Sequence, residues 1–352
     1  MSSAVSASSA TRETWIDALK GWGMILIVVG HVWSLSDVPQ WYMWIFSFHV
    51  PLFFFAAGLT FKPHAAPLGE FARRRLTTLL LPYLVYALLG YVFYVLGFAA
   101  AQLAGKTVAQ FGYGLWWPLL GVFYGSVGDG LLVNSPLWFL PALFLAQAFV
   151  HVIHTHVRLR WQRYALLLAL FAIAAGIEES IKAPFSLVPA MAAAVFIQMG
   201  LDCKRAARLE TVSTGMRWLG LVALVSLSLL SPINGAVGLA GPTVNHPVLF
   251  LLFALVGIGL SLLFVHLAGR RVQDALAILG RHSMGILVLH MLAIKGVKVV
   301  LSIATGTSLD TMEHSIGWGV LVLGVASLLI WPAIAVIERW LPWTLGNRRP
   351  AA

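Results

Sequence analysis

Three polar side chains near the N-terminus have the spacing of residues that share one face of a helix. Asp17, Lys20 and His31 lie in the otherwise apolar run DALKGWGMILIVVGH. On an ideal helix Lys20 and His31 are about three turns apart, and Asp17 lies one turn before Lys20. A helix that touched only lipid would not keep this stripe, because hydrocarbon rejects polar groups that neither protein nor water contacts. The imidazole would lie about 16 Å beyond the charged pair, and a histidine in a dry cavity can take a proton as a general base.

A second histidine, His49, lies in the next apolar run, WYMWIFSFHVPLFFFAAGLTFK. Helical geometry places it about 20 Å from the predicted cytoplasmic boundary, at a depth similar to that of His31. Two rings at matched depth on successive helices predict a shared site. The alternative, in which each ring only bonds a neighbouring helix, stays open, more so for His49 and for His290 in a later run. Pro51 favours a kink, and residues 56–58 (Ala-Ala-Gly) allow close helix packing.

Arg73, Arg74 and Arg75 form a basic run directly before the third apolar run. Such a run serves first as a charge cluster that fixes topology. Guanidinium groups also bind phosphates through paired hydrogen bonds. The two interpretations are compatible, so the sequence also predicts an anion site open to the cytoplasm.

No metal site is predicted. His151, His154 and His156 are close in sequence, but they lie among arginines at a membrane exit without a carboxylate or cysteine to complete a site. The sequence has a single cysteine, Cys203, so a disulfide framework is excluded. A thiol nucleophile is not favoured either. The sequence also lacks a trustworthy P-loop, G-x-S-x-G or H-E-x-x-H motif.

The elements that must position these residues are apolar helices. A composition that is 60% hydrophobic and 10% charged, with a mean hydropathy of +0.88, excludes an ordinary soluble globule. A helix needs about 20 residues to cross the hydrocarbon. We therefore predict an all-α polytopic membrane protein with about ten transmembrane helices, at approximately 16–36, 41–61, 76–99, 136–156, 164–178, 184–203, 217–232, 247–268, 283–304 and 315–337.

The net charge of +10 is explained by loops on one side of the membrane, so no nucleic-acid partner is predicted. With ten spans and both termini cytoplasmic, the positive-inside rule is satisfied, and nine or eleven spans stay open. We predict a disordered N-terminal tail at 1–14, a membrane domain at 15–340 and a C-terminal tail at 341–352. The Lys and Arg residues outside the cytoplasmic segments are Lys106, Lys182, Lys295 and Lys298.

Nearly the whole chain resembles membrane acyltransferase family 3, especially its fucose 4-O-acetyltransferase-like and exopolysaccharide O-acetyltransferase members. WIDALKGWGMILIVVGH is similar to the family's signature of a basic residue, ten residues and a histidine, with Lys20 where arginine is common. Lysine keeps the positive charge but lacks the planar guanidinium group with which arginine makes paired hydrogen bonds to a phosphate or carboxylate. FSFHVPLFFFAAGLTFK is similar to the second-helix pattern F-H-x-P-L-F-F-F-x-x-G. The later blocks that the chain resembles are RRRLTTLLLPY, SPLWFLPALFL, NHPVLFLLFALVGIGLSLL and GRHSMGILVLHM.

The resemblance implies a multi-pass enzyme of the bacterial inner membrane. It would move acetyl from cytoplasmic acetyl-CoA to a sugar hydroxyl of an exported or surface polysaccharide or of its lipid-linked repeat, for example a xanthan-like mannose. His31 is then expected to be the general base, and His49 to position the acceptor or the oxyanion. Asp17 and Lys20 would organise the cytoplasmic end of the donor path. The CoA phosphates would bind Arg73, Arg74 and Arg75.

Two questions stay open in the sequence. A transporter or flippase for a sugar or lipid-linked sugar would use the same polar stripe as a path, although no internal repeat is visible. The segment 100–135, with GYGLWWPLLGVFYG, suits a re-entrant or interfacial segment that either fixes depth as an aromatic belt or lines an acceptor site. The aromatic residues concerned are Trp116, Trp117, Tyr124 and Trp138.

Overall fold

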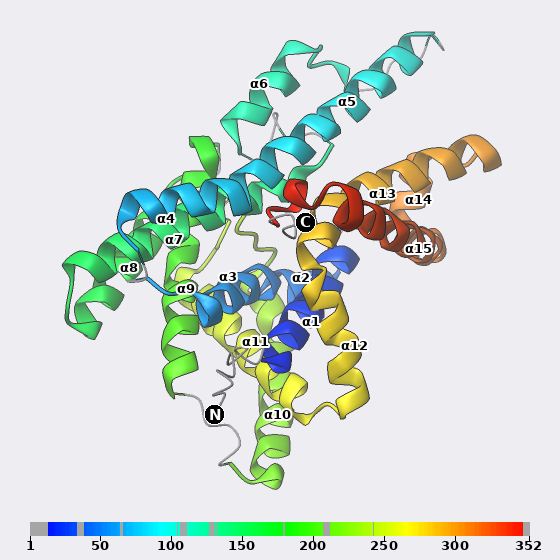
Figure 1. The fold of residues 1–352 in the computed structure, drawn as a ribbon. Helices are drawn as coiled ribbons and strands as arrows, with labels where there is room; N and C mark the ends of the chain where they lie inside the picture. The colour runs from blue at the N-terminus through cyan, green and yellow to red at the C-terminus, as the bar shows by residue number, and fades with distance from the viewer. Residues whose placement is uncertain are drawn as a thin grey trace, which may run out of the picture.

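The computed structural model describes residues 13–33, 39–63, 66–103, 105, 111–126, 131, 133–178, 180–206, 212–241 and 243–347, and these residues fold into helices (Figure 1). Within them no strand forms apart from an isolated bridge between Gly238 and Thr243. An apolar chain in hydrocarbon must satisfy its backbone hydrogen bonds internally, which a helix does. The predicted all-α polytopic class is confirmed. Residues 1–12 and 348–352 of the two predicted tails lie outside the described residues.

Eight helical segments of the described chain are long and apolar enough to cross a membrane. Two further predicted runs are the shorter helices α1 (Thr14–Gly30) and α8 (Arg160–Ala175), with 17 and 16 residues. Every predicted run thus coincides with a helix, while the number of crossings and the side of the termini remain predictions. The eight segments are Gln40–Thr60, Leu68–Leu103, Ser135–His156, Pro184–Lys204, Thr214–Asn234, Pro247–Leu267, Ser283–Thr305 and Ile316–Trp340.

The second predicted span is broken into α2 (Gln40–Phe46) and α3 (His49–Thr60). Phe48 leaves helical geometry, with φ −144° and ψ −18°. Pro51 then lies in the first turn of α3, where its missing N–H has no partner to lose. The break therefore falls just before His49 and makes that residue the first of a new helix.

The third span contains a π-helical segment, η1 (Leu76–Leu80), between α4 (Leu68–Arg75) and α5 (Leu81–Leu103). Pro82 has no N–H to give to the carbonyl four residues earlier. The hydrogen bonding shifts to five-residue spacing, with the N–H of Leu81 donating to the Leu76 carbonyl. This shift rotates the arginine-bearing helix α4 relative to α5.

The remaining helices complete the bundle around α9 (Leu187–Ala206), which packs against α3, α7 (Phe139–His156) and α8. α10 (Thr214–Ser228) packs on α11 (Pro247–Leu267), and α13 (Ser283–Thr305) packs on α15 (Ile316–Trp340). In Figure 1, α5 and α6 (Trp116–Tyr124) project together at one end, and α13, α14 (Leu309–His314) and α15 project at another. The short η elements are 3-10 turns: η3 (Ser135–Trp138), η4 (Pro184–Ser186), η6 (Ser231–Asn234) and η7 (Pro342–Leu345).

Gly58 and Gly200 let α3 and α9 pack with their backbones in contact. A Cβ on Gly58 of α3 would lie 2.1 Å from the Ile197 carbonyl oxygen of α9. One on Gly200 would lie 2.0 Å from the Phe55 oxygen. The close packing predicted for residues 56–58 is therefore confirmed.

An amphipathic helix, α12 (Arg270–Arg281), was not predicted. It packs against α1 so closely that a Cβ on Gly21 would lie 1.9 Å from the Leu276 oxygen, and one on Gly280 would lie 1.8 Å from the Asp17 oxygen. Its polar positions make it too hydrophilic for a span, so a search for apolar runs assigns it to a loop. Its signal is the helical spacing of its apolar residues.

Candidate active site

Three histidines from three helices meet beside α1. His31 follows the last residue of α1, His49 opens α3, and His290 lies within α13. The ring centroids of His31 and His290 are 5.3 Å apart, with the rings edge to face at 77°. Phe46 lies between the other pair, 6.4 Å from His31 and 4.6 Å from His49. His49 and His290 are buried and His31 is half-buried, so His31 is the most accessible member of the cluster.

Backbone contacts determine which ring nitrogen of each histidine carries hydrogen. The Nδ1 atoms of His31 and His49 lie 2.7 and 2.8 Å from the carbonyl oxygens of Ile27 and Ile45. His290 Nδ1 lies 3.0 and 2.9 Å from the carbonyls of residues 286 and 287. A carbonyl oxygen can only accept, so each Nδ1 must donate. In the neutral rings every Nε2 therefore keeps its lone pair and can act as a base.

His290 is the member of this cluster to which sequence reasoning gave no role. It is 0% exposed, and its Nε2 has no hydrogen-bond partner among the described residues. On the same helix, the Val288 carbonyl accepts from Asn134 Nδ2 at 2.9 Å, and the other amide atom of Asn134, Oδ1, likewise lacks a described partner. Buried polar atoms without partners are rare and call for an explanation, such as a bound group. The feature of the sequence that could have identified His290 is its place as a histidine inside an apolar run.

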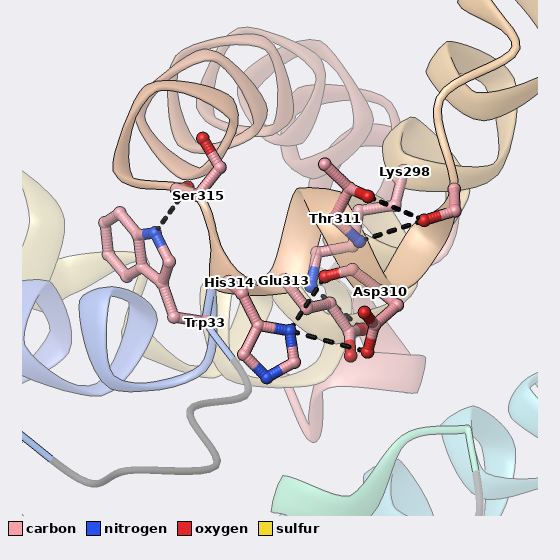
Figure 2. A network of polar contacts seen from close by, with 8 residues as sticks. Trp33, Lys298, Asp310, Thr311, Glu313, His314 and Ser315 are labelled. Atoms are coloured by element: carbon pink, nitrogen blue, oxygen red, sulfur yellow. Dashed lines mark hydrogen bonds and ion pairs between the residues drawn. The ribbon is translucent and has the colours of Figure 1, made fainter.

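The end of α1 is tied to α14 and α15 by the contacts in Figure 2. Trp33, two residues beyond His31, donates from Nε1 to the Ser315 carbonyl at 3.1 Å. The buried Lys298 of α13 forms an ion pair with Glu313 of α14 at 3.1 Å (Figure 2). The Trp33 contact ties the chain after α1 to the start of α15, and the ion pair ties α14 to α13, which carries His290.

Asp17 and Lys20 lie on α1, at the end away from His31. Asp17 is buried and Lys20 is half-buried, and the Asp17 backbone contacts Gly280 of α12. Neither side chain lines the hollow that holds the arginine run. Their role with the arginines in donor binding therefore stays a prediction.

The arginine run borders a hollow of about 970 Å³. Arg73 is exposed on its rim, and Arg74 forms an ion pair with Glu70. Arg75 is half-buried, and its guanidinium lies 5.8 Å from the ring centroids of both Phe61 and Phe71. The residues that line this basic hollow are Thr60, Lys62, Ala66, Glu70, Phe71, Arg73, Arg74, Arg75, Thr77, Thr78, Leu81, His151, Trp343, Gly346 and Asn347.

The three histidines of α7 serve different contacts. His154 Nε2 donates to Gln198 Oε1 at 2.7 Å, and His151 stacks on Phe71 with centroids 4.6 Å apart. His156 is exposed and contacts the Val152 carbonyl at 3.0 Å. In the described part of the chain no three His, Cys, Asp or Glu residues form a metal-binding group.

The aromatic residues of the 100–135 segment and its flank have different surroundings. Trp116, Trp117 and Tyr124 of α6 are exposed, which suits either an aromatic belt or an acceptor wall. Trp138 is buried in the core, so it is not available to stack on a sugar. α6 packs on α5 through Tyr83, whose hydroxyl donates to the Val122 carbonyl.

Comparison with known proteins identifies the family of the chain. A family model described as an acyltransferase domain matches residues 13–337, which include all three clustered histidines and the arginine run. No curated protein and no solved structure gives a significant match. Because the family model covers most of the chain, this polytopic helical protein belongs to acyltransferase family 3.

Proposed function

We propose that this acyltransferase moves an acetyl group from cytoplasmic acetyl-CoA to a sugar hydroxyl of an exported or surface polysaccharide or of its lipid-linked repeat. As the acceptor we propose a sugar such as a xanthan-like mannose, and as the location the bacterial inner membrane. The observation that carries the proposal is the His31 contact with Ile27, which leaves Nε2 unprotonated at the open edge of a buried histidine cluster. A base in that position is what an alcohol needs to attack a thioester.

In the proposed reaction the sugar oxygen attacks the acetyl carbonyl carbon while its proton moves to His31 Nε2. The C–S bond of the thioester then breaks. The departing CoA thiolate takes the proton from His31, which returns the ring to its starting state. The products are the O-acetyl sugar and CoA.

His49 and His290 hold the acceptor in this scheme. Their Nε2 atoms accept hydrogen bonds, because the proton of each neutral ring is on Nδ1. Donation to an oxyanion would require a second proton on either ring. Lys295, a cation on the same helix as His290, is a better candidate to stabilise the oxyanion.

The donor would reach this cluster from the basic hollow, where Arg73 and Arg74 offer guanidinium groups to the CoA phosphates. Arg75, whose guanidinium lies beside the rings of Phe61 and Phe71, would serve chiefly to fix the wall of the hollow. Asp17 and Lys20 keep their proposed place at the cytoplasmic end of α1, beside the donor path and outside the hollow.

The test replaces His31 with alanine in a strain that lacks the native gene and measures glycan O-acetyl content by NMR. We expect acetylation to fall by about 10²- to 10⁴-fold, the usual contribution of a general base. His156→Ala is the matched control, because His156 has the same type of Nδ1 contact with a carbonyl but lies outside the cluster. Wild-type acetylation by a normally expressed His31→Ala variant would refute the role of base. A transporter, in contrast, would not bind CoA.

A further inference from the structure

The C-terminal turn η7 and the two residues after it form one wall of the basic hollow. Trp343, Gly346 and Asn347 line it together with residues of α4 and η1. The sequence predicted a tail here, but Thr344 and Leu345 are buried. The part of this segment that the structure describes is therefore folded against the membrane domain.

Specific contacts hold the turn in place. The hydroxyls of Tyr86 and Thr344 are 3.1 Å apart, and the Thr344 hydroxyl donates to the Leu341 carbonyl at 2.8 Å. Gly346 has φ +74°, a conformation that favours glycine. A Cβ at Gly346 would lie 2.7 Å from the Cα of Thr78, so the turn contacts the π-helical segment directly. Trp343 is thus presented on a fixed support.

The hollow combines positive charge with this aromatic face. Its described lining holds four cations, Lys62 and the three arginines, against one carboxylate, Glu70, which pairs with Arg74. Trp343 is 41% exposed. Aromatic side chains beside cationic grooves are suited to nucleotides, because the base stacks on the ring while the phosphates meet the cations.

We propose that Trp343 binds the purine of the acyl donor and so makes the hollow selective for a nucleotide-bearing thioester. This inference rests on the proposed function and adds a specificity-determining residue to it. The phosphates lie against Arg73 and Arg74, and the pantetheine arm leads away from the nucleotide toward the histidine cluster. Acyl thioesters that lack the nucleotide would gain no binding affinity from Trp343.

The test measures ligand binding to the purified full-length protein by titration calorimetry, with three ligands. These are CoA, adenosine 3′,5′-bisphosphate, which carries the base, and 4′-phosphopantetheine, which lacks it. We expect Trp343→Ala to weaken binding of the first two by about tenfold or more and to leave 4′-phosphopantetheine unchanged. Trp343→Phe, which keeps an aromatic face, should retain most of the affinity.

Two further variants make the result specific. Trp340→Ala removes a nearby tryptophan that is 66% exposed and does not line the hollow, so it should bind all three ligands as the wild type does. Arg73→Gln should weaken all three, because each carries phosphate. Equal affinity of the wild type and Trp343→Ala for CoA, or an equal loss for all three ligands in Trp343→Ala, would overturn the proposal. Failure of the wild type to bind CoA would instead refute the donor assigned under the proposed function.

Discussion

At the scale of single residues, the effect of replacing a buried histidine depends on whether its ring nitrogen has a hydrogen-bond partner. His290 Nε2 lacks a described partner, while His154 Nε2 donates to Gln198. Replacing a paired group leaves its partner buried and unsatisfied, whereas replacing an unsatisfied group removes a cost. Stability and activity should therefore respond in opposite directions at His290 if the atom is kept for a substrate.

We predict that His290→Leu keeps or raises the melting temperature and lowers the acetylation rate by about tenfold or more, since a positioned hydrogen bond to the acceptor is lost. His154→Leu should lower stability by about 1–3 kcal/mol. Thermal unfolding in detergent and acetylation assays at equal protein amounts give the two readouts. A His290→Leu variant that melts earlier but acetylates normally would assign the ring a structural role.

At the scale of elements, α1 and α12 are locked by the contact of their backbones at Gly21 and Gly280. This contact fixes the helix that carries Asp17, Lys20 and, just past its end, His31. α13, which carries His290, follows α12 after one residue. The packing of an unpredicted amphipathic helix thus contributes to where two of the three histidines lie.

Gly280→Ala is expected to destabilise the protein by about 1–3 kcal/mol or more, because the new methyl group meets a backbone oxygen rather than a movable side chain. Gly296→Ala in α13 is the matched control, since no atom lies within 4 Å of its added methyl group. Helix propensity should make that variant equally or more stable, by up to about 1 kcal/mol. Similar melting temperatures for both variants would contradict the close crossing of α1 and α12.

At the scale of the whole molecule, the basic hollow and helix α14 are predicted to face opposite sides of the membrane. Asp310, on α14, is 87% exposed at its side chain, and Asn347, at the hollow, is exposed. These two residues flank α15, so they lie on different sides if α15 crosses the membrane. With a cytoplasmic N-terminus, an even number of crossings puts Asn347 in the cytoplasm and Asp310 outside, and an odd number reverses the two.

The sole cysteine makes this topology testable by labelling. In a Cys203→Ser background, Asp310→Cys should react with a membrane-impermeant maleimide in cells with an intact cytoplasmic membrane. Asn347→Cys should react only after lysis, because the cytoplasm shields it. Labelling of both positions in intact cells would rule out the ten-span arrangement.

The sequence predicted the membrane-spanning elements well, because each depends on local composition. All ten apolar runs are helices, and the family blocks identified His31 and His49. It did not predict the pairing of His31 with His290 or the wall formed by Trp343, because both depend on contacts between distant segments. The sequence did not predict α12, because its many polar residues lower its average hydropathy. The helical spacing of its apolar residues could have identified it.

The orientation of each ring in the histidine cluster comes from a carbonyl three or four residues before it. His31 and His290 bond carbonyls of their own helices, α1 and α13, three or four residues earlier. His49, the first residue of α3, bonds the Ile45 carbonyl at the end of α2, across the break between the two helices. In the proposed reaction, a separation of α1 from α13 that admitted the acceptor would therefore leave the hydrogen on Nδ1 of both His31 and His290. The hydrogen on His49 would keep its partner only if α2 and α3 moved together.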